Sequence, residues 1–142
     1  MTIELVPSPC WGKNVRARVS PHEWRRIQEA VFHRASGKCQ LCGWQGGLHC
    51  HEVWRYDESS GVQALEGFLA LCRFCHEVKH IGLANVHGRY RQAIAHLARV
   101  NRWSRSSAAE YANRCFEIHE RRSRREWSQD LTALNAWLGR DR

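Results

Sequence analysis

Long apolar runs, proline and acidic residues are all scarce in this chain. No apolar run approaches the ~18 residues that a membrane-spanning helix needs. The first residues, MTIELVPSPCWGKN, lack the basic stretch followed by an apolar stretch that marks a secretory signal. We therefore expect a cytoplasmic protein with no membrane partner.

Acidic residues are outnumbered by basic ones. The 14 Asp and Glu stand against 22 Lys and Arg, which gives a formal net charge of +8. This balance favours a polyanionic partner, above all a nucleic acid. The densest basic segment either follows phosphates or forms a solvated helix face paired with neighbouring glutamates. It consists of Arg121, Arg122, Arg124 and Arg125.

With 142 residues, 43% of them hydrophobic, the chain is long enough for one compact domain. We expect an irregular arm over residues 1–19, a core over 20–85 and a helical segment over 86–142 packed on that core. The fold class predicted from these patterns is α+β.

Capping residues and turn residues indicate the elements of the core. Ser20, Pro21 and Glu23 form a helix start with a capping box, and Gly37 is expected to follow the helix end. Apolar residues then predict short strands over 48–54 and 68–71, separated by a polar loop over 55–67. A helix is predicted over 75–81, ending near Gly82.

The second half of the chain has a helical pattern. Tyr90, Ile94 and Leu97 form one apolar stripe. A capping box at Ser107 and Glu110 predicts the start of a second long helix. The pattern continues through a third set of apolar residues, Trp127, Leu131, Leu134 and Leu138.

The seven cysteines include two C-x-x-C pairs. In a reducing compartment such pairs suit a tetrahedral structural zinc site rather than disulfides. The ligands would be Cys39, Cys42, Cys72 and Cys75, with Cys10, Cys50 and Cys115 left as free thiols. The 29 residues between Cys42 and Cys72 exceed the usual gap of roughly 15–20, so a functional segment is expected inside the knuckle.

Histidines gather around this inserted segment. His51 lies on the first predicted strand, and His76 and His80 are spaced to share one face of the helix that follows the second cysteine pair. Such a group beside a rigid knuckle suits a second, reactive metal site.

The stretches RASGKCQLCG, LHCHEVW and LCRFCHEVKH resemble the zinc-knuckle branch of the HNH endonucleases, the ββα-metal superfamily. The resemblance covers roughly residues 24–82. It implies metal-dependent hydrolysis of phosphodiester bonds in DNA on a small ββα-metal core. It also implies a structural Zn²⁺ on the four knuckle cysteines and a catalytic Mg²⁺, Mn²⁺ or similar ion.

The resemblance assigns roles to the three histidines. His51 corresponds to the general base, and His76 and His80 correspond to ligands of the catalytic ion. Phosphate contacts are expected from Arg55, Arg73 and Lys79, each of which also suits a solvated surface. The sequence does not determine the oligomeric state, and a homodimer is compatible with it.

Two positions depart from the family pattern: Cys50, and Gly67, near which the family has a central Asn. Cys50 stands where Asp or His, a metal ligand, usually precedes the base, and a thiolate is a poor ligand for Mg²⁺. Cys50 then serves as a soft ligand or as a small buried apolar residue. In the second case, His49, Glu52 or water completes the metal shell.

Two other functions compete for the same residues. The segment from His76 to His80 reads H-E-x-x-H, as in zinc proteases, although the third downstream ligand of the extended pattern is out of register. A zinc-dependent DNA-binding module without catalysis would also retain the basic charge and the knuckle.

Overall fold

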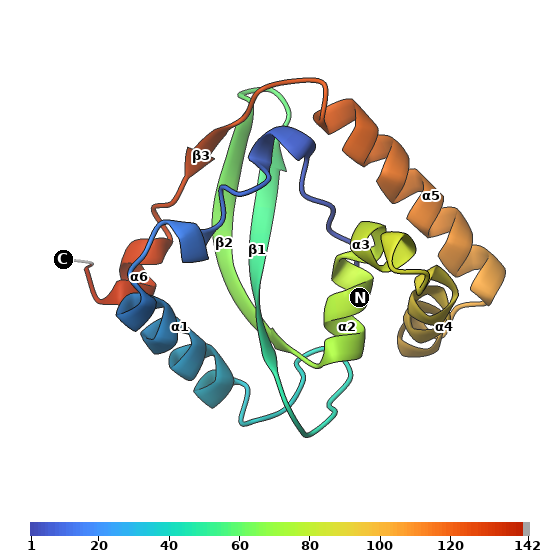
Figure 1. The fold of residues 1–142 in the computed structure, drawn as a ribbon, viewed down its shortest axis with the longest axis horizontal. Coiled ribbons are helices and arrows are strands. Elements are labelled where there is room, and N and C mark those ends of the chain that lie inside the picture. The colour runs from blue at the N-terminus through green and yellow to red at the C-terminus, as the bar shows by residue number, and fades with distance from the viewer. Residues whose placement is uncertain (141–142) are drawn as a thin grey trace.

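The computed structural model describes residues 1–140, and it has the α+β architecture that the sequence predicts (Figure 1). A long antiparallel hairpin crosses the centre of the molecule, with one group of helices on each side. Within the described residues no helix is both long and apolar enough to cross a bilayer. The end of the predicted segment 86–142, residues 141–142, lies outside this description.

The hairpin consists of β1 (His49–Asp57) and β2 (Val62–Leu71). Its register pairs His49 with Leu71 and shifts between Val53 and Trp54, opposite the positive-φ residue Gly67. The prediction of a loop over residues 55–67 is therefore wrong: the strands continue to a short turn. The segment looked polar because side chains such as Arg55 alternate outward to solvent.

On one side of the hairpin lies α1 (Pro21–Arg34). The predicted capping box is confirmed, since the Ser20 side chain accepts the Glu23 backbone N–H and the Glu23 carboxylate accepts the Ser20 N–H. Ile27 and Val31 of α1 are buried against apolar residues of the sheet. This packing fixes the face of β1 that Cys50 and Trp54 occupy.

On the other side lie α2 (Arg73–Lys79), α3 (Ile81–Val86), α4 (Tyr90–Asn101) and α5 (Arg105–Arg122) (Figure 1). Their shared core includes Val78, Ile81 and Leu97. The predicted helix end at Gly82 is wrong. The helix α2 ends at Lys79 with His80 as its C-cap, and Gly82 lies inside α3.

Two further predictions about the second half need correction. The cap of α5 is Ser104, whose side chain accepts the Ser107 N–H, so the helix starts earlier than a capping box at Ser107 implies. Trp127 does not continue a helix. It precedes β3 (Ser128–Asp130), which pairs parallel to β2, and α6 (Leu134–Leu138) is the only helix between Trp127 and residue 140.

The arm at residues 1–19 is irregular apart from the 3₁₀ turns Ser8–Cys10 and Val15–Ala17. It runs between the helices and the hairpin (Figure 1). Ile3 is buried in the helical core, and its N–H is donated to the Tyr111 hydroxyl of α5 at 3.1 Å. The arm is therefore bound firmly to the helices beside the first strand.

Candidate functional site

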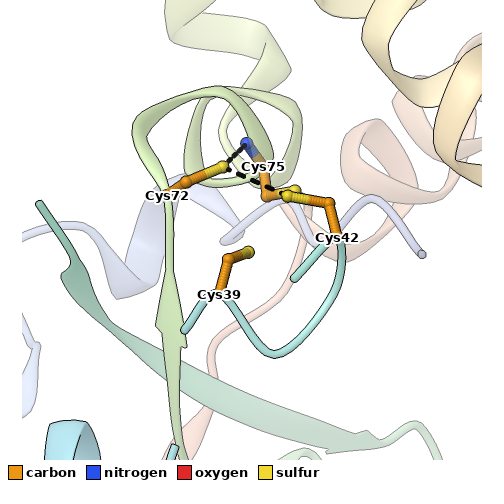
Figure 2. Close-up of side chains that lie close together, drawn as sticks. All are labelled: Cys39, Cys42, Cys72 and Cys75. Carbon is orange, nitrogen blue, oxygen red and sulfur yellow. Dashed lines mark hydrogen bonds between the residues drawn. The ribbon is translucent and has the colours of Figure 1, made fainter. Parts of the chain in front are cut away.

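The four knuckle cysteines come together from two segments far apart in sequence (Figure 2). Cys39 and Cys42 lie on the turn after α1, where Gly43 adopts a left-handed conformation. Cys72 is the N-cap of α2, and its sulfur accepts the backbone N–H of Cys75. The predicted cysteine cluster is thus present and can hold a metal ion.

The chemistry of this cluster fits zinc. The four sulfur atoms lie within 4.8 Å of one another, and the sulfurs of Cys42 and Cys72 are 3.7 Å apart. Zn–S bonds of ~2.3 Å in a tetrahedron place sulfurs ~3.8 Å apart. Burial opposes ionisation of Cys39, but hydrogen bonds from backbone N–H groups outweigh it and lower its pKa to about 7. Burial, followed by the neighbouring cysteines, raises the pKa of Cys42 and Cys75, so Cys39 is the member of the cluster that is shifted towards the thiolate, the form that binds metal.

A second cluster lies nearby and consists of three histidines. His51 of β1 meets His76 of α2 and His80 at its C-terminal end, and one ligand atom from each lies within 4.8 Å of the others. The rings of His76 and His80 are 4.7 Å apart between centroids, as their helical spacing predicts. This trio, called the histidine cluster below, can hold one ion.

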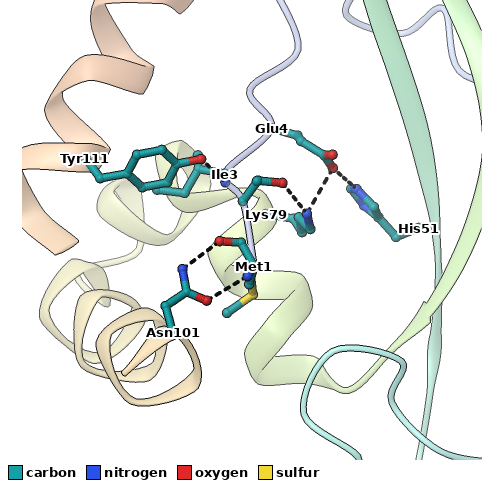
Figure 3. Close-up of polar contacts among 8 residues, drawn as sticks. Met1, Ile3, Glu4, His51, Lys79, Asn101 and Tyr111 are labelled. Atoms are coloured by element: carbon teal, nitrogen blue, oxygen red, sulfur yellow. Dashed lines mark hydrogen bonds and ion pairs between the residues drawn. The ribbon is translucent and has the colours of Figure 1, made fainter. Parts of the chain in front are cut away.

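Glu4, from the N-terminal arm, lies beside His51 of the histidine cluster (Figure 3). Its Oε2 lies 2.9 Å from Nε2 of His51 and 3.3 Å from the ammonium of Lys79, which also donates to the Thr2 hydroxyl. Burial opposes the charge on Glu4, but the bond from His51 and the charge of Lys79 outweigh it and lower its pKa. A carboxylate accepts from His51 Nε2–H and leaves the Nδ1 lone pair available.

The other two histidines are held in their neutral form. Burial, followed by the charges of neighbouring histidines, lowers the pKa of His76 to about 3 and that of His80 to about 4. Both imidazoles therefore carry free lone pairs at neutral pH, as metal ligands must. A cavity of about 260 Å³ adjoins the cluster and is lined by residues of the arm, β1 and α2.

Cys50, next to His51 in sequence, does not belong to the histidine cluster. The Cys50 side chain lies against the apolar core on the opposite face of β1. Burial, with the nearby charge of Glu52, raises its pKa to about 12, so it remains a thiol. Glu52 also points away from the cluster and accepts the Val15 N–H at 2.8 Å. His49 is exposed, and the centroid of its ring lies 5.0 Å from that of His76.

The glutamate of the H-E-x-x-H segment has a different partner. Both carboxylate oxygens of Glu77 bind the Arg89 guanidinium, at 2.6 and 3.2 Å. A general base of a zinc protease would have to face the ion instead. This geometry does not suit the protease alternative.

The residues expected to contact phosphate differ in exposure. Lys79 is only 2% exposed and pairs with Glu4, a placement that does not suit the surface contact expected of it. Arg55 and Arg73 are exposed, with Arg55 3.7 Å from Glu66 and Arg73 stacked over Phe74.

The four arginines of the basic segment at the end of α5 also differ, in exposure and in their partners. Arg122 pairs with Glu58 of the hairpin turn at 2.5 Å, and Arg125 donates to the Glu58 carbonyl. Arg121 and Arg124 are exposed and make no side-chain hydrogen bond or ion pair to the rest of residues 1–140. Only these last two are open to a partner.

Two features of the site escaped sequence analysis. Glu4 is 47 positions from His51, and no local spacing marks it as a partner. His96 of α4 lies against Cys75, again without a motif.

Comparison of the chain with protein-family models, with curated proteins and with solved structures finds no match in any of the three.

Proposed function

We propose that this protein is a metal-dependent endonuclease of the HNH type that hydrolyses phosphodiester bonds in DNA. The observation that carries the proposal is the meeting of His51, His76 and His80 at the junction of β1 and α2, beside a separate four-cysteine cluster. An antiparallel hairpin followed directly by a short helix agrees with a ββα-metal core. The net charge of +8 suits a DNA substrate.

In this proposal His76 and His80 hold a divalent ion, and the four cysteines hold a structural Zn²⁺. The bound ion would polarise the phosphate and stabilise the departing 3′ oxygen. His51 takes a proton from the attacking water at Nδ1, while Glu4 accepts its Nε2–H and fixes both tautomer and ring orientation. Lys79 balances the charge of Glu4 from the buried side.

The donor set bears on the choice of ion. Neutral imidazoles suit Zn²⁺, Co²⁺, Ni²⁺ and Mn²⁺ better than Mg²⁺, which prefers oxygen ligands. Among residues 1–140 no carboxylate belongs to the three-histidine group. We therefore propose a transition ion at this site and place Mg²⁺ last among those expected from the sequence.

A second role for His51 is favoured by one distance. Its ligand atom lies within 4.8 Å of those of His76 and His80, close enough for it to be a third ligand rather than the base. Glu4 would then form the carboxylate–histidine–metal arrangement common in metal sites. A titration separates the two roles. Protein that holds zinc on the four cysteines is titrated with a second divalent ion, and His51→Ala lowers the affinity for that ion only if His51 is a ligand.

The experiment that tests the proposed function is cleavage of supercoiled plasmid across a metal series. The zinc-loaded protein is supplied with Mg²⁺, Mn²⁺, Co²⁺ or Ni²⁺ after removal of loosely bound ions. We expect nicking with the transition ions and little with Mg²⁺. Binding of DNA without cleavage under every ion would instead favour the non-catalytic binding module.

Replacement of Glu4 tests its role beside His51. Glu4→Gln removes the carboxylate charge and the ion pair with Lys79, so we expect cleavage to slow by roughly 10–100-fold, as for other partners of functional histidines. The rate is measured at equal zinc content. The matched control is Glu66→Gln, an exposed glutamate on β2 that should cleave normally. Equal rates for both variants would count against a role for Glu4.

The two open arginines at the end of α5, Arg121 in its last turn and Arg124 two residues beyond the helix, predict a salt effect. Changing Arg121 and Arg124 to Gln should reduce the slope of log affinity for DNA against log salt by about two, since each phosphate contact contributes about 0.9. The control changes Arg25 and Arg26, two exposed arginines of α1, in the same way. If both double variants lose the same slope, the loss reflects net charge and not a contact made by α5.

A further inference from the structure

Helix α4 lies beyond the segment that carries both clusters, yet it places one side chain against the cysteines. His96 is 8% exposed, and its Nε2 lies 3.2 Å from the sulfur of Cys75. Its Nδ1 lies 2.9 Å from a terminal nitrogen of Arg99, one turn later on the same helix. Both ring nitrogens of this buried imidazole therefore have a partner.

The chemistry of arginine determines the tautomer. A guanidinium has only donors, so Nδ1 of His96 must be the acceptor and carries no proton. The ring proton is then on Nε2, and it faces the Cys75 sulfur. The sulfur is the acceptor in this pair. A thiolate is a much stronger acceptor than a thiol, because hydrogen bonds to charged groups are roughly twice as strong.

We propose that His96 is a positioning residue of the cysteine metal site. It donates its Nε2–H to the metal-bound thiolate of Cys75, and Arg99 holds the imidazole in the required tautomer. Four thiolates around one divalent ion leave an excess of negative charge, which this N–H donor and the adjacent guanidinium offset. The proposal concerns the cysteine cluster alone and stands whether or not the protein cleaves DNA.

One consequence is structural. Cys75 is on α2 and His96 is on α4, so the N–H···S bond joins the metal site to the helices that follow it. Loss of the metal should then loosen the packing between α2 and α4, and loss of the donor should make the metal easier to remove.

The first test is the rate of zinc release to a chelator from the full-length zinc-loaded protein. His96→Leu fills the space without a donor, and we expect zinc affinity to fall 10–100-fold, with correspondingly faster release. His96→Gln retains an N–H and should restore part of the loss. The control, His22→Leu, changes an exposed histidine of α1 and should release zinc at the wild-type rate.

The second test measures the electronic environment of the cysteine sulfur directly, and it does not depend on the stability of the folded protein. In the Co²⁺-substituted protein, loss of the N–H donor raises the energy of the sulfur lone pairs. The sulfur-to-cobalt charge-transfer band of His96→Leu should therefore shift to lower energy. Arg99→Ala, which leaves the core residue in place, should shift it in the same direction by a smaller amount.

Two outcomes would overturn the proposal. One is a His96→Leu protein with wild-type zinc release and an unchanged charge-transfer energy. The other is a wild-type charge-transfer intensity corresponding to three thiolates, which would make His96 itself a ligand in place of a cysteine.

Discussion

Removal of zinc from the cysteine cluster is expected to unfold the core and not merely to slow its chemistry. The cluster joins the turn after α1 to the start of α2, and its small core contains Leu71 with three of the cysteines. Structural zinc contributes apparent binding energies of about 10–16 kcal/mol in small domains. Loss of even ~5 kcal/mol in a chain of this size lowers the melting temperature by roughly 10–20 °C.

This prediction is measured by thermal unfolding with and without a strong chelator, and by the same scan on Cys72→Ser. Cys72 is buried and also caps α2, so its replacement removes both a ligand and the cap. The matched control is Cys115→Ser, which alters a half-buried cysteine of α5 outside the cluster. A chelator-treated protein that melts at the zinc-loaded temperature would show that the cysteines are not a structural metal site.

The second large effect is expected from the helix histidines. His76→Ala should reduce DNA cleavage by at least about 100-fold, the upper end of what loss of an outer-shell partner costs. The reason is that the imidazole is neutral and faces both His51 and His80. The rate is followed by plasmid nicking with the most active ion found for the wild-type protein.

The control for His76 is His87→Ala, which removes an exposed histidine that follows α3 and does not belong to the cluster. It should retain full activity. Bound zinc should stay the same in both variants, because the cysteine site is separate. A His76→Ala protein that cleaves at the wild-type rate would remove this residue from the proposed metal site.

Features with short-range determinants were predictable from the sequence. The capping box at Ser20 and Glu23 needs only two side chains three residues apart, and it is present. The pairing of His76 with His80 follows from helical geometry. The cysteine cluster was also predictable, because a metal ion accepts few arrangements of two C-x-x-C pairs.

Features that depend on tertiary packing were not predictable. The length of β2 was underestimated because its first half carries polar residues, and Gln63 is buried only through contacts with Tyr56 and Gln129. The start of α5 was misplaced because Ser104 and Ser107 both suit a helix cap, and in the structure the Ser104 side chain accepts the Ser107 N–H.

The same reasoning applies to the site. Glu4 reaches His51 because the arm is anchored on the helices, by Tyr111 of α5 and Asn101 of α4. Lys79 looked like a surface cation, but its ammonium is buried because Glu4 and Thr2 provide partners. No periodicity or motif connects these residues, so only the folded chain reveals the network.

The most direct test of the central claim is plasmid nicking by the wild-type protein and by His51→Ala, with zinc measured on both. The account predicts metal-dependent nicking by the wild type and a loss of about 10²–10⁴-fold in the variant, the range for removal of a general base, at unchanged zinc content. Nicking by His51→Ala at the wild-type rate would contradict it.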